Sequence, residues 1–254
     1  MPDFERDGVV LHYIEKSASG IEKGADDGAG GKDAFPVLLF APGGMRSAAG
    51  FWKNSPWNPV DALSDRYRVI AMDQRNAGKS RGPVTGLDGW HTYTADHIAL
   101  LDHLGIDRCH VIGGCIGGPY CLGLMQAAPE RVAAAVLQQT IGAHENRQAF
   151  YEMFDSWAQE IAAEHPEASE DDWKAFRSRM YDGDFVFNVD RDFVRACPTP
   201  MLVLMGDDLY HPQVTSRELA ALAPRAELVE HWKDDAVVDE TVARVRSFLE
   251  AHTP

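Results

Sequence analysis

The sequence lacks the basic surplus of nucleic-acid-binding proteins and the long apolar runs of membrane proteins. Its 254 residues carry 24 Lys and Arg against 39 Asp and Glu, a formal net charge of −15. Because no basic surplus exists to neutralise phosphates, a nucleic-acid partner is not expected. No apolar run approaches the roughly 18 residues of a membrane span, so no membrane association is expected. The opening "MPDFERDGVVLHY" lacks a basic segment followed by an apolar one, so we predict no signal peptide and a cytoplasmic location.

Cysteine is also scarce. The four cysteines are Cys109, Cys115, Cys121 and Cys197, and in the cytoplasm their thiols stay reduced. The first three are too far apart for a CxxC pair, and no histidine cluster accompanies them, so no metal site is expected. The segment "PGGM" lacks the G-K-[ST] ending of a phosphate loop, and we expect no cofactor.

Short apolar runs alternate with helical patterns along most of the chain. Most of these runs show no polar alternation, which is typical of a parallel sheet covered on both faces. Strand alternating with helix predicts βαβ units with right-handed crossovers. The predicted strands are Val9–Lys16, Phe35–Ala41, Tyr67–Met72, Cys109–Gly113, Ala133–Gln138, Pro200–Gly206 and Ala226–Glu230. The clearest predicted helices are Pro59–Asp65, Thr92–Ile106, the segment after Cys115, and residues 239–252.

Two segments do not follow this alternation of strands and helices. "SASGIEKGADDGAGGKDA", residues 17–34, is rich in Gly, Asp and Ala and is predicted to be a mobile surface loop. Residues 143–196 contain no buried strand and instead show a helical pattern rich in aromatic residues. The second segment is therefore predicted to be a helical insertion between two strands of the sheet.

The stretch "HVIGGCIGGPYC" places one cysteine between two glycine pairs, at a junction of strand and helix. A strand, G-x-nucleophile-x-G and a helix together form a nucleophile elbow. Gly113 and Gly117 pack against each other and the neighbouring strand, where only very small side chains fit. Gly118 lets the following helix approach the sheet. The motif thus identifies Cys115 as the mounted nucleophile, while Cys109 and Cys121 are expected to be buried structural thiols.

At these motifs the chain resembles the α/β-hydrolase family, over nearly its whole length. "LLFAPGGMRSAAGFW" matches the loop after the family's third strand, and "VIAMDQRNAGKS" resembles its D-x-R-G-x-G-x-S segment, with Asn76 where Gly is usual. Asn tolerates a left-handed backbone, so the turn is expected to survive. The resemblance implies a mostly parallel eight-stranded sheet flanked by helices. Its core comprises residues 1–142 and 197–254, and residues 143–196 form a helical cap.

The family resemblance also orders the catalytic residues as nucleophile, acid and base. Most members have Ser at the elbow, whereas this chain has Cys115, as dienelactone hydrolases do. The acid follows the seventh strand, where Asp207 and Asp208 compete; Asp208 is favoured because it stands four residues before Pro212. The histidine follows the eighth strand, which indicates His231. The alternative base is His211, which lies near the acid loop.

These residues together imply acyl chemistry on a small-molecule substrate. A Cys115 thiolate attacks a carbonyl carbon, His231 transfers protons, and Asp208 orients the imidazole. The oxyanion donors implied are the N–H of Ile116 and one N–H from Gly44 or Met45. The sequence therefore predicts a hydrolase that cleaves an ester, lactone or thioester through an acyl-cysteine. The alternatives are an acyltransferase with the same triad and a non-catalytic binding or sensor protein. The sequence gives no indication of oligomeric state.

The elbow spacing generates a test with cysteine variants. Cys115→Ala is expected to fold normally, because alanine fits the elbow, and to lose nearly all hydrolase activity. Cys109→Ala and Cys121→Ala are expected to keep theirs. Ester hydrolysis by the three purified variants and the wild type measures this, and comparable rates for Cys115→Ala and wild type would contradict the predicted nucleophile.

Overall fold

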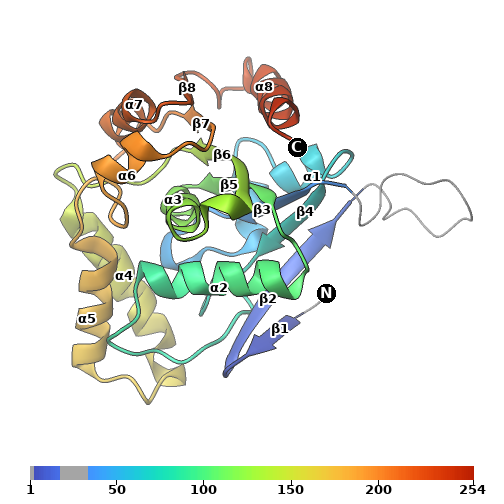
Figure 1. The fold of residues 1–254 in the computed structure, drawn as a ribbon. Helices are drawn as coiled ribbons and strands as arrows, with labels where there is room; N and C mark the ends of the chain where they lie inside the picture. Colours follow the sequence, from blue (N-terminus) through green and yellow to red (C-terminus); the bar gives the residue numbers. More distant parts are fainter. Residues whose placement is uncertain (1–2, 18–33) are drawn as a thin grey trace, which may run out of the picture.

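One eight-stranded sheet organises the molecule (Figure 1). The computed structural model describes residues 3–17 and 34–254, so the loop predicted at residues 17–34 lies almost wholly outside the described residues. The strand order is β1-β2-β4-β3-β5-β6-β7-β8. Strand β2 runs antiparallel to β1 and β4, and every other pair is parallel. The strands are β1 (Asp3–Arg6), β2 (Val9–Lys16), β3 (Pro36–Phe40), β4 (Arg68–Met72), β5 (Cys109–Gly114), β6 (Val132–Gln138), β7 (Met201–Leu204) and β8 (Ala226–Val229).

The predicted mostly parallel sheet is confirmed. Each of the seven apolar runs forms a strand, and almost every residue of β3 to β7 is buried. Leu38 of β3 pairs with Ile70 of β4 on one side and with Val111 of β5 on the other. The eighth strand, β1, is mainly polar and exposed at the sheet edge, so it shows no apolar run from which it could be predicted.

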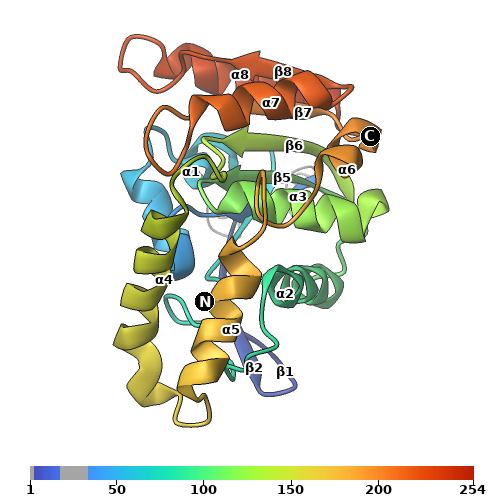
Figure 2. The same ribbon diagram turned by 90° about the vertical axis from the view of Figure 1, so that its left-hand side faces the viewer.

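Alternate residues of the central strands supply two separate hydrophobic layers. Leu38 and Phe40 belong to the layer that holds side chains of α2 (Trp90–His103), α3 (Gly117–Ala127) and α7 (Gln213–Leu222). Val37 and Leu39 belong to the opposite layer, with side chains of α1 (Pro59–Leu63) and α8 (Val238–Ala251). Helices therefore cover both faces of the sheet, as Figures 1 and 2 show.

The segment between β6 and β7 is helical, as its sequence pattern predicts. It contains α4 (Arg147–Ile161), α5 (Glu170–Tyr181) and α6 (Arg191–Ala196). Helices α4 and α5 lie side by side at one flank of the molecule (Figure 2) and bury aromatic side chains in the layer that also holds α2 and α3. None of the helices in residues 3–17 and 34–254 combines the length and apolar character needed to cross a bilayer.

The turn between β5 and α3 leaves no room for side chains at its glycines. A Cβ on Gly113 would lie 2.0 Å from the carbonyl oxygen of Gly117, and a Cβ on Gly117 would lie 2.2 Å from that of Phe40. A Cβ on Gly118 would meet the hydroxyl of Thr140 at 2.4 Å. The close packing predicted from the glycine pairs is therefore present, and it draws α3 against the sheet.

A second predicted left-handed turn lies after β4. Asn76 has φ of 59°, the conformation for which glycine is usual and which Asn tolerates best among other residues. Its side-chain oxygen accepts a hydrogen bond of 2.8 Å from the N–H of Gly82. Asparagine thus retains the turn and adds a contact that glycine lacks.

Steric exclusion at the elbow predicts a stability loss. Gly113→Ala is expected to lower the free energy of unfolding by at least about 2 kcal/mol, because the new methyl would overlap a backbone oxygen that cannot move freely. Urea unfolding measures the change. Gly50→Ala is the matched control, since a Cβ there meets no atom within 4 Å. Equal stability of the two variants would show that the elbow does not require its glycines.

Candidate active site

Cys115 lies at the carboxyl end of β5, in the position that the elbow motif predicts. Its φ of 59° is left-handed, a strained region for a residue other than glycine. Its N–H donates to the carbonyl of Gln138 at 3.0 Å, and its own carbonyl accepts from the N–H of Gly118 at 3.1 Å. The thiol is free and partly exposed. Backbone bonds on both sides therefore hold one reactive side chain in a fixed, strained turn.

The structure brings Asp208 and His211 to this thiol, both from the loop between β7 and α7. The Nδ1 of His211 lies 2.7 and 2.8 Å from the two carboxylate oxygens of Asp208. The same carboxylate accepts from the backbone N–H groups of Tyr210 at 2.9 Å and His211 at 3.1 Å. The side chain of Asp208 is half exposed, whereas that of His211 is only 10% exposed. The Asp208 carboxylate therefore stabilises the turn to which it belongs and orients the His211 ring.

The imidazole of His211 and the thiol of Cys115 stabilise each other's charged forms. Burial lowers the pKa of His211, but the Cys115 thiolate and the Asp208 carboxylate outweigh it and raise that pKa to about 9. Burial raises the pKa of Cys115, but the hydrogen bond and charge of His211 outweigh it and bring that pKa below its ordinary value. Because Nδ1 faces Asp208, Nε2 is the ring atom left for the sulfur. The two shifts in opposite directions favour a thiolate–imidazolium pair over a neutral thiol and imidazole.

Two backbone N–H groups also face the sulfur. Hydrogen bonds from Gly43 and Ile116 contribute to the lowered pKa of Cys115. The oxyanion donors predicted from the sequence are the N–H of Ile116 and one N–H from Gly44 or Met45. The two N–H groups that act on the sulfur are those of Ile116 and Gly43. Gly43 and Gly44 both have left-handed φ, 124° and 57°. The side chain of Met45 is buried in the core instead.

His231, the predicted base, does not lie at Cys115, and this prediction is corrected. His231 follows β8 but is exposed. The next residue, Trp232, is 1% exposed and donates its indole N–H to the carbonyl of Met205 at 2.7 Å. Burial of Trp232 turns the adjacent histidine to solvent. The competing acid Asp207 also points elsewhere, because its carboxylate pairs with Lys233.

The sequence offered a local signal for His211. An aspartate side chain that caps the N–H groups two and three residues later forms a compact turn, and "DLYHP" places the histidine third after Asp208. The family order of residues instead directed the prediction to the loop after β8. Within the part of the chain that the structure describes, no three His, Cys, Asp or Glu side chains gather as metal ligands would.

Comparisons with known proteins agree with the fold. The family model of the alpha/beta hydrolase fold matches residues 36–199, and the chain belongs to this family. The "Putative carbamate hydrolase RutD" of Stutzerimonas stutzeri (strain A1501) is 26% identical over 221 residues, which cover 76% of this chain and 82% of the relative. The protein of the same name from Azorhizobium caulinodans is 36% identical over 102 residues, 40% of this chain, and the match spans only 36% of that relative. The enol-lactonase from Burkholderia xenovorans LB400 has the same fold, with a TM-score of 0.70, 21% identity, and 98% and 100% of the two chains covered.

The interaction of Cys115 with His211 predicts how the alkylation rate of Cys115 changes with pH. Alkylation by iodoacetamide is expected to proceed well below the pH at which an ordinary thiol reacts, because the pKa of Cys115 is lowered. In His211→Ala the cation is lost while the burial remains, so the alkylation profile is expected to move to higher pH. The pH dependence of the alkylation rate, with the adduct mapped to Cys115, measures both.

His231→Ala is the matched control for this measurement. Its profile is expected to coincide with that of the wild type, because His231 is exposed. A shift in His231→Ala with none in His211→Ala would reverse the assignment of the imidazole.

Proposed function

We propose that this α/β hydrolase cleaves a carboxylic ester, lactone or thioester through a covalent acyl intermediate on Cys115. In this proposal His211 is the base and Asp208 orients it, in place of the predicted His231. The observation that carries the proposal is the left-handed Cys115 beside His211, whose Nδ1 faces Asp208 and whose Nε2 is buried without a hydrogen-bond partner among the described residues. The charge of His211 and two backbone N–H groups lower the pKa of this thiol. A buried structural thiol needs neither the strained turn nor the imidazolium.

The proposed reaction has two halves. The Cys115 thiolate attacks the carbonyl carbon, a C–S bond forms, and the carbonyl electron pair moves to oxygen beside the N–H groups of Gly43 and Ile116. The oxyanion collapses, the bond to the leaving group breaks, and Nε2 of His211 gives that group its proton. Neutral His211 then takes a proton from water, whose hydroxide attacks the thioester. Collapse releases the carboxylic acid and restores thiolate and imidazolium.

The helices between β6 and β7 are proposed to cap this site. In the proposed division, residues 1–142 and 197–254 form the core and residues 143–196 the cap. Contacts at the site support it: Arg46, beside Met45, binds Glu160 of α4 through two hydrogen bonds of 2.6 and 2.8 Å. The Phe150 ring of α4 lies 5.3 Å from the ring of Tyr210, the residue before His211. A reactive thiolate also fits the reducing cytoplasm that the sequence predicts.

Pre-steady-state kinetics with an activated aryl ester test the proposal directly. One equivalent of phenol is expected in a burst, with a matching acyl mass on Cys115 in a quenched sample. A non-catalytic binder would give neither burst nor adduct. Hydrolysis of the ester with Cys115 unmodified at every time point would contradict the acyl-cysteine. If the acyl group passes to an added alcohol or thiol faster than to water, the enzyme is an acyltransferase.

A sulfur nucleophile predicts that the rate of hydrolysis depends on the leaving group of the substrate. A thiolate leaves easily from the tetrahedral intermediate, so productive collapse requires a group that departs as readily. We expect kcat/KM to fall from thioesters and enol lactones to aryl esters and then alkyl esters, with amides not measurably cleaved. A carbamate belongs in the same series, because relatives of this chain bear the name carbamate hydrolase. A carbamate whose nitrogen must leave is expected to react as slowly as the amides.

Cys115→Ser supplies the matched control. An alkoxide nucleophile is a poorer leaving group than a thiolate, so the serine variant is expected to show a smaller gap between aryl and alkyl esters. The measurement is kcat/KM for one acyl group on each leaving group, in both proteins. Efficient amide cleavage by the wild type, or the same gap in both proteins, would show that leaving-group chemistry does not explain the cysteine.

A further inference from the structure

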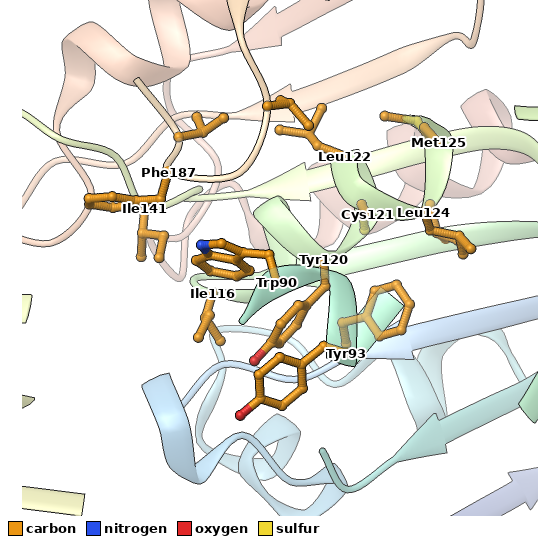
Figure 3. Close-up of a cluster of buried hydrophobic side chains, with 14 of the residues drawn as sticks. Trp90, Tyr93, Ile116, Tyr120, Cys121, Leu122, Leu124, Met125, Ile141 and Phe187 are labelled. Atoms are coloured by element: carbon orange, nitrogen blue, oxygen red, sulfur yellow. The ribbon is translucent and has the colours of Figure 1, made fainter. Parts of the chain in front are cut away.

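A buried tyrosine with an unpaired hydroxyl lies beside the elbow. Tyr120 is on α3, one turn after Ile116, and its N–H donates to the Ile116 carbonyl at 3.3 Å. Side chains on a helix lean toward its N-terminus, so this ring extends toward the turn that holds Cys115. Figure 3 shows the Tyr120 hydroxyl on the side of Ile116. Tyr120 is 1% exposed, and its hydroxyl has no hydrogen-bond partner among the described residues.

A second tyrosine hydroxyl reaches the same region from the α4–α5 pair. Tyr181, at the end of α5, is fully buried and donates only to the sulfur of Met45, at 3.4 Å. A thioether is a weak acceptor, so this hydroxyl too lacks a strong partner. Met45 follows directly on Gly43 and Gly44, the loop whose N–H faces Cys115.

Aromatic rings connect both tyrosines with the catalytic histidine. The Trp90 ring lies 5.4 Å from that of Tyr120 and 6.2 Å from that of Tyr181. Phe150 stacks on Tyr181 at 5.2 Å and contacts Tyr210, next to His211, at 5.3 Å. This aromatic wall is apolar apart from its hydroxyls, so the unpaired Tyr120 hydroxyl is a polar point within it, near enough to Cys115 for the thiolate charge to act on it.

The electrostatics define what these hydroxyls can bind. Burial, and then the neighbouring tyrosine and thiolate charges, raise the pKa values of Tyr120 and Tyr181 far above the usual range. Both hydroxyls therefore stay protonated and available as donors. Arg46, the cation beside Met45, is already bound by Glu160, and a carboxylate near the thiolate would meet repulsion. The matching ligand group is a neutral oxygen acceptor.

We propose that Tyr120, assisted by Tyr181, donates a hydrogen bond to a neutral keto or hydroxyl oxygen on the acyl part of the substrate. The inference rests on the proposed function and narrows it. A buried hydroxyl left unpaired is costly, and a ligand oxygen removes that cost. The preferred substrates are therefore short acyl groups that carry an oxygen beyond the scissile carbonyl, rather than plain alkyl acyl groups.

A series of thioesters with one thiol and four acyl groups tests the specificity. The acyl groups are butyryl, 3-oxobutyryl, 3-hydroxybutyryl and succinyl. The wild type is expected to prefer the 3-oxo and 3-hydroxy compounds over butyryl by about ten- to a hundredfold in kcat/KM, with succinyl disfavoured. Tyr120→Phe is expected to lose that preference while its rate with butyryl stays within about twofold. Tyr181→Phe is expected to reduce the preference less.

Tyr13→Phe is the matched control, because Tyr13 is also buried but lies on β2, and the groups that affect its pKa do not include Cys115. It is expected to keep the wild-type preference. The proposal is overturned if the wild type shows no preference for oxygenated acyl groups, or if Tyr120→Phe retains it. A preference for succinyl would point to a cationic subsite and overturn it as well.

A binding measurement separates this proposal from the proposed function. Cys115→Ala is expected to bind methyl acetoacetate more tightly than methyl butyrate in calorimetric titration, and the double variant with Tyr120→Phe is expected to bind the two alike. This difference requires no turnover, so it stands even if no ester acylates Cys115. Equal binding of both esters by Cys115→Ala would contradict the polar subsite.

Discussion

The site depends on one tight backbone approach. Strand β5 must pass into α3 within two residues, and the carbonyl of Gly117 and the Cα of Gly113 come so close that no Cβ fits between them. This approach forces Cys115 into left-handed backbone geometry and places Ile116 where its N–H faces the sulfur. The backbone hydrogen bonds of Cys115 to Gln138 and Gly118 and the buried strands on both sides hold this strained turn in place.

The candidate acid and histidine come from the same short segment of the chain. Asp208 and His211 belong to a single turn, in which the carboxylate binds both the imidazole and the N–H groups of the same residues. The loop after β8 therefore does not have to supply the histidine, and its Trp232 packs in the core. A short turn of this kind orients the imidazole through local contacts alone, which suits a half-exposed acid whose side chain would otherwise have many rotamers.

The sequence predicts the fold well because parallel strands covered on both faces are apolar throughout. The strands β3 to β7 could be predicted for this reason. The elbow could be predicted because the spacing of its glycines matches a turn in which no larger side chain fits. Strand β1 was missed because "DFER" carries no apolar signal at an exposed edge. Helix α7 was missed as well, between two correctly predicted strands.

The site was predicted in part, for physical reasons. Local sequence was sufficient to place Cys115 and Ile116 at the turn after β5 and Asp208 in the loop after β7, and their catalytic roles stay predictions. The histidine depends on which of two loops reaches the thiol, and the burial of Trp232 turns the other candidate, His231, to solvent. Which N–H of the Gly43–Met45 loop binds an oxyanion stays a prediction.

The central claim is that His211 is an imidazolium paired with the Cys115 thiolate, and NMR titration of labelled histidine side chains tests it most directly. We expect His211 to stay doubly protonated up to a pKa of about 9 and to titrate at lower pH in Cys115→Ala, where the thiolate is absent. A His211 that is neutral at pH 8 in the wild type, or one whose titration does not change when Cys115 is removed, would contradict it.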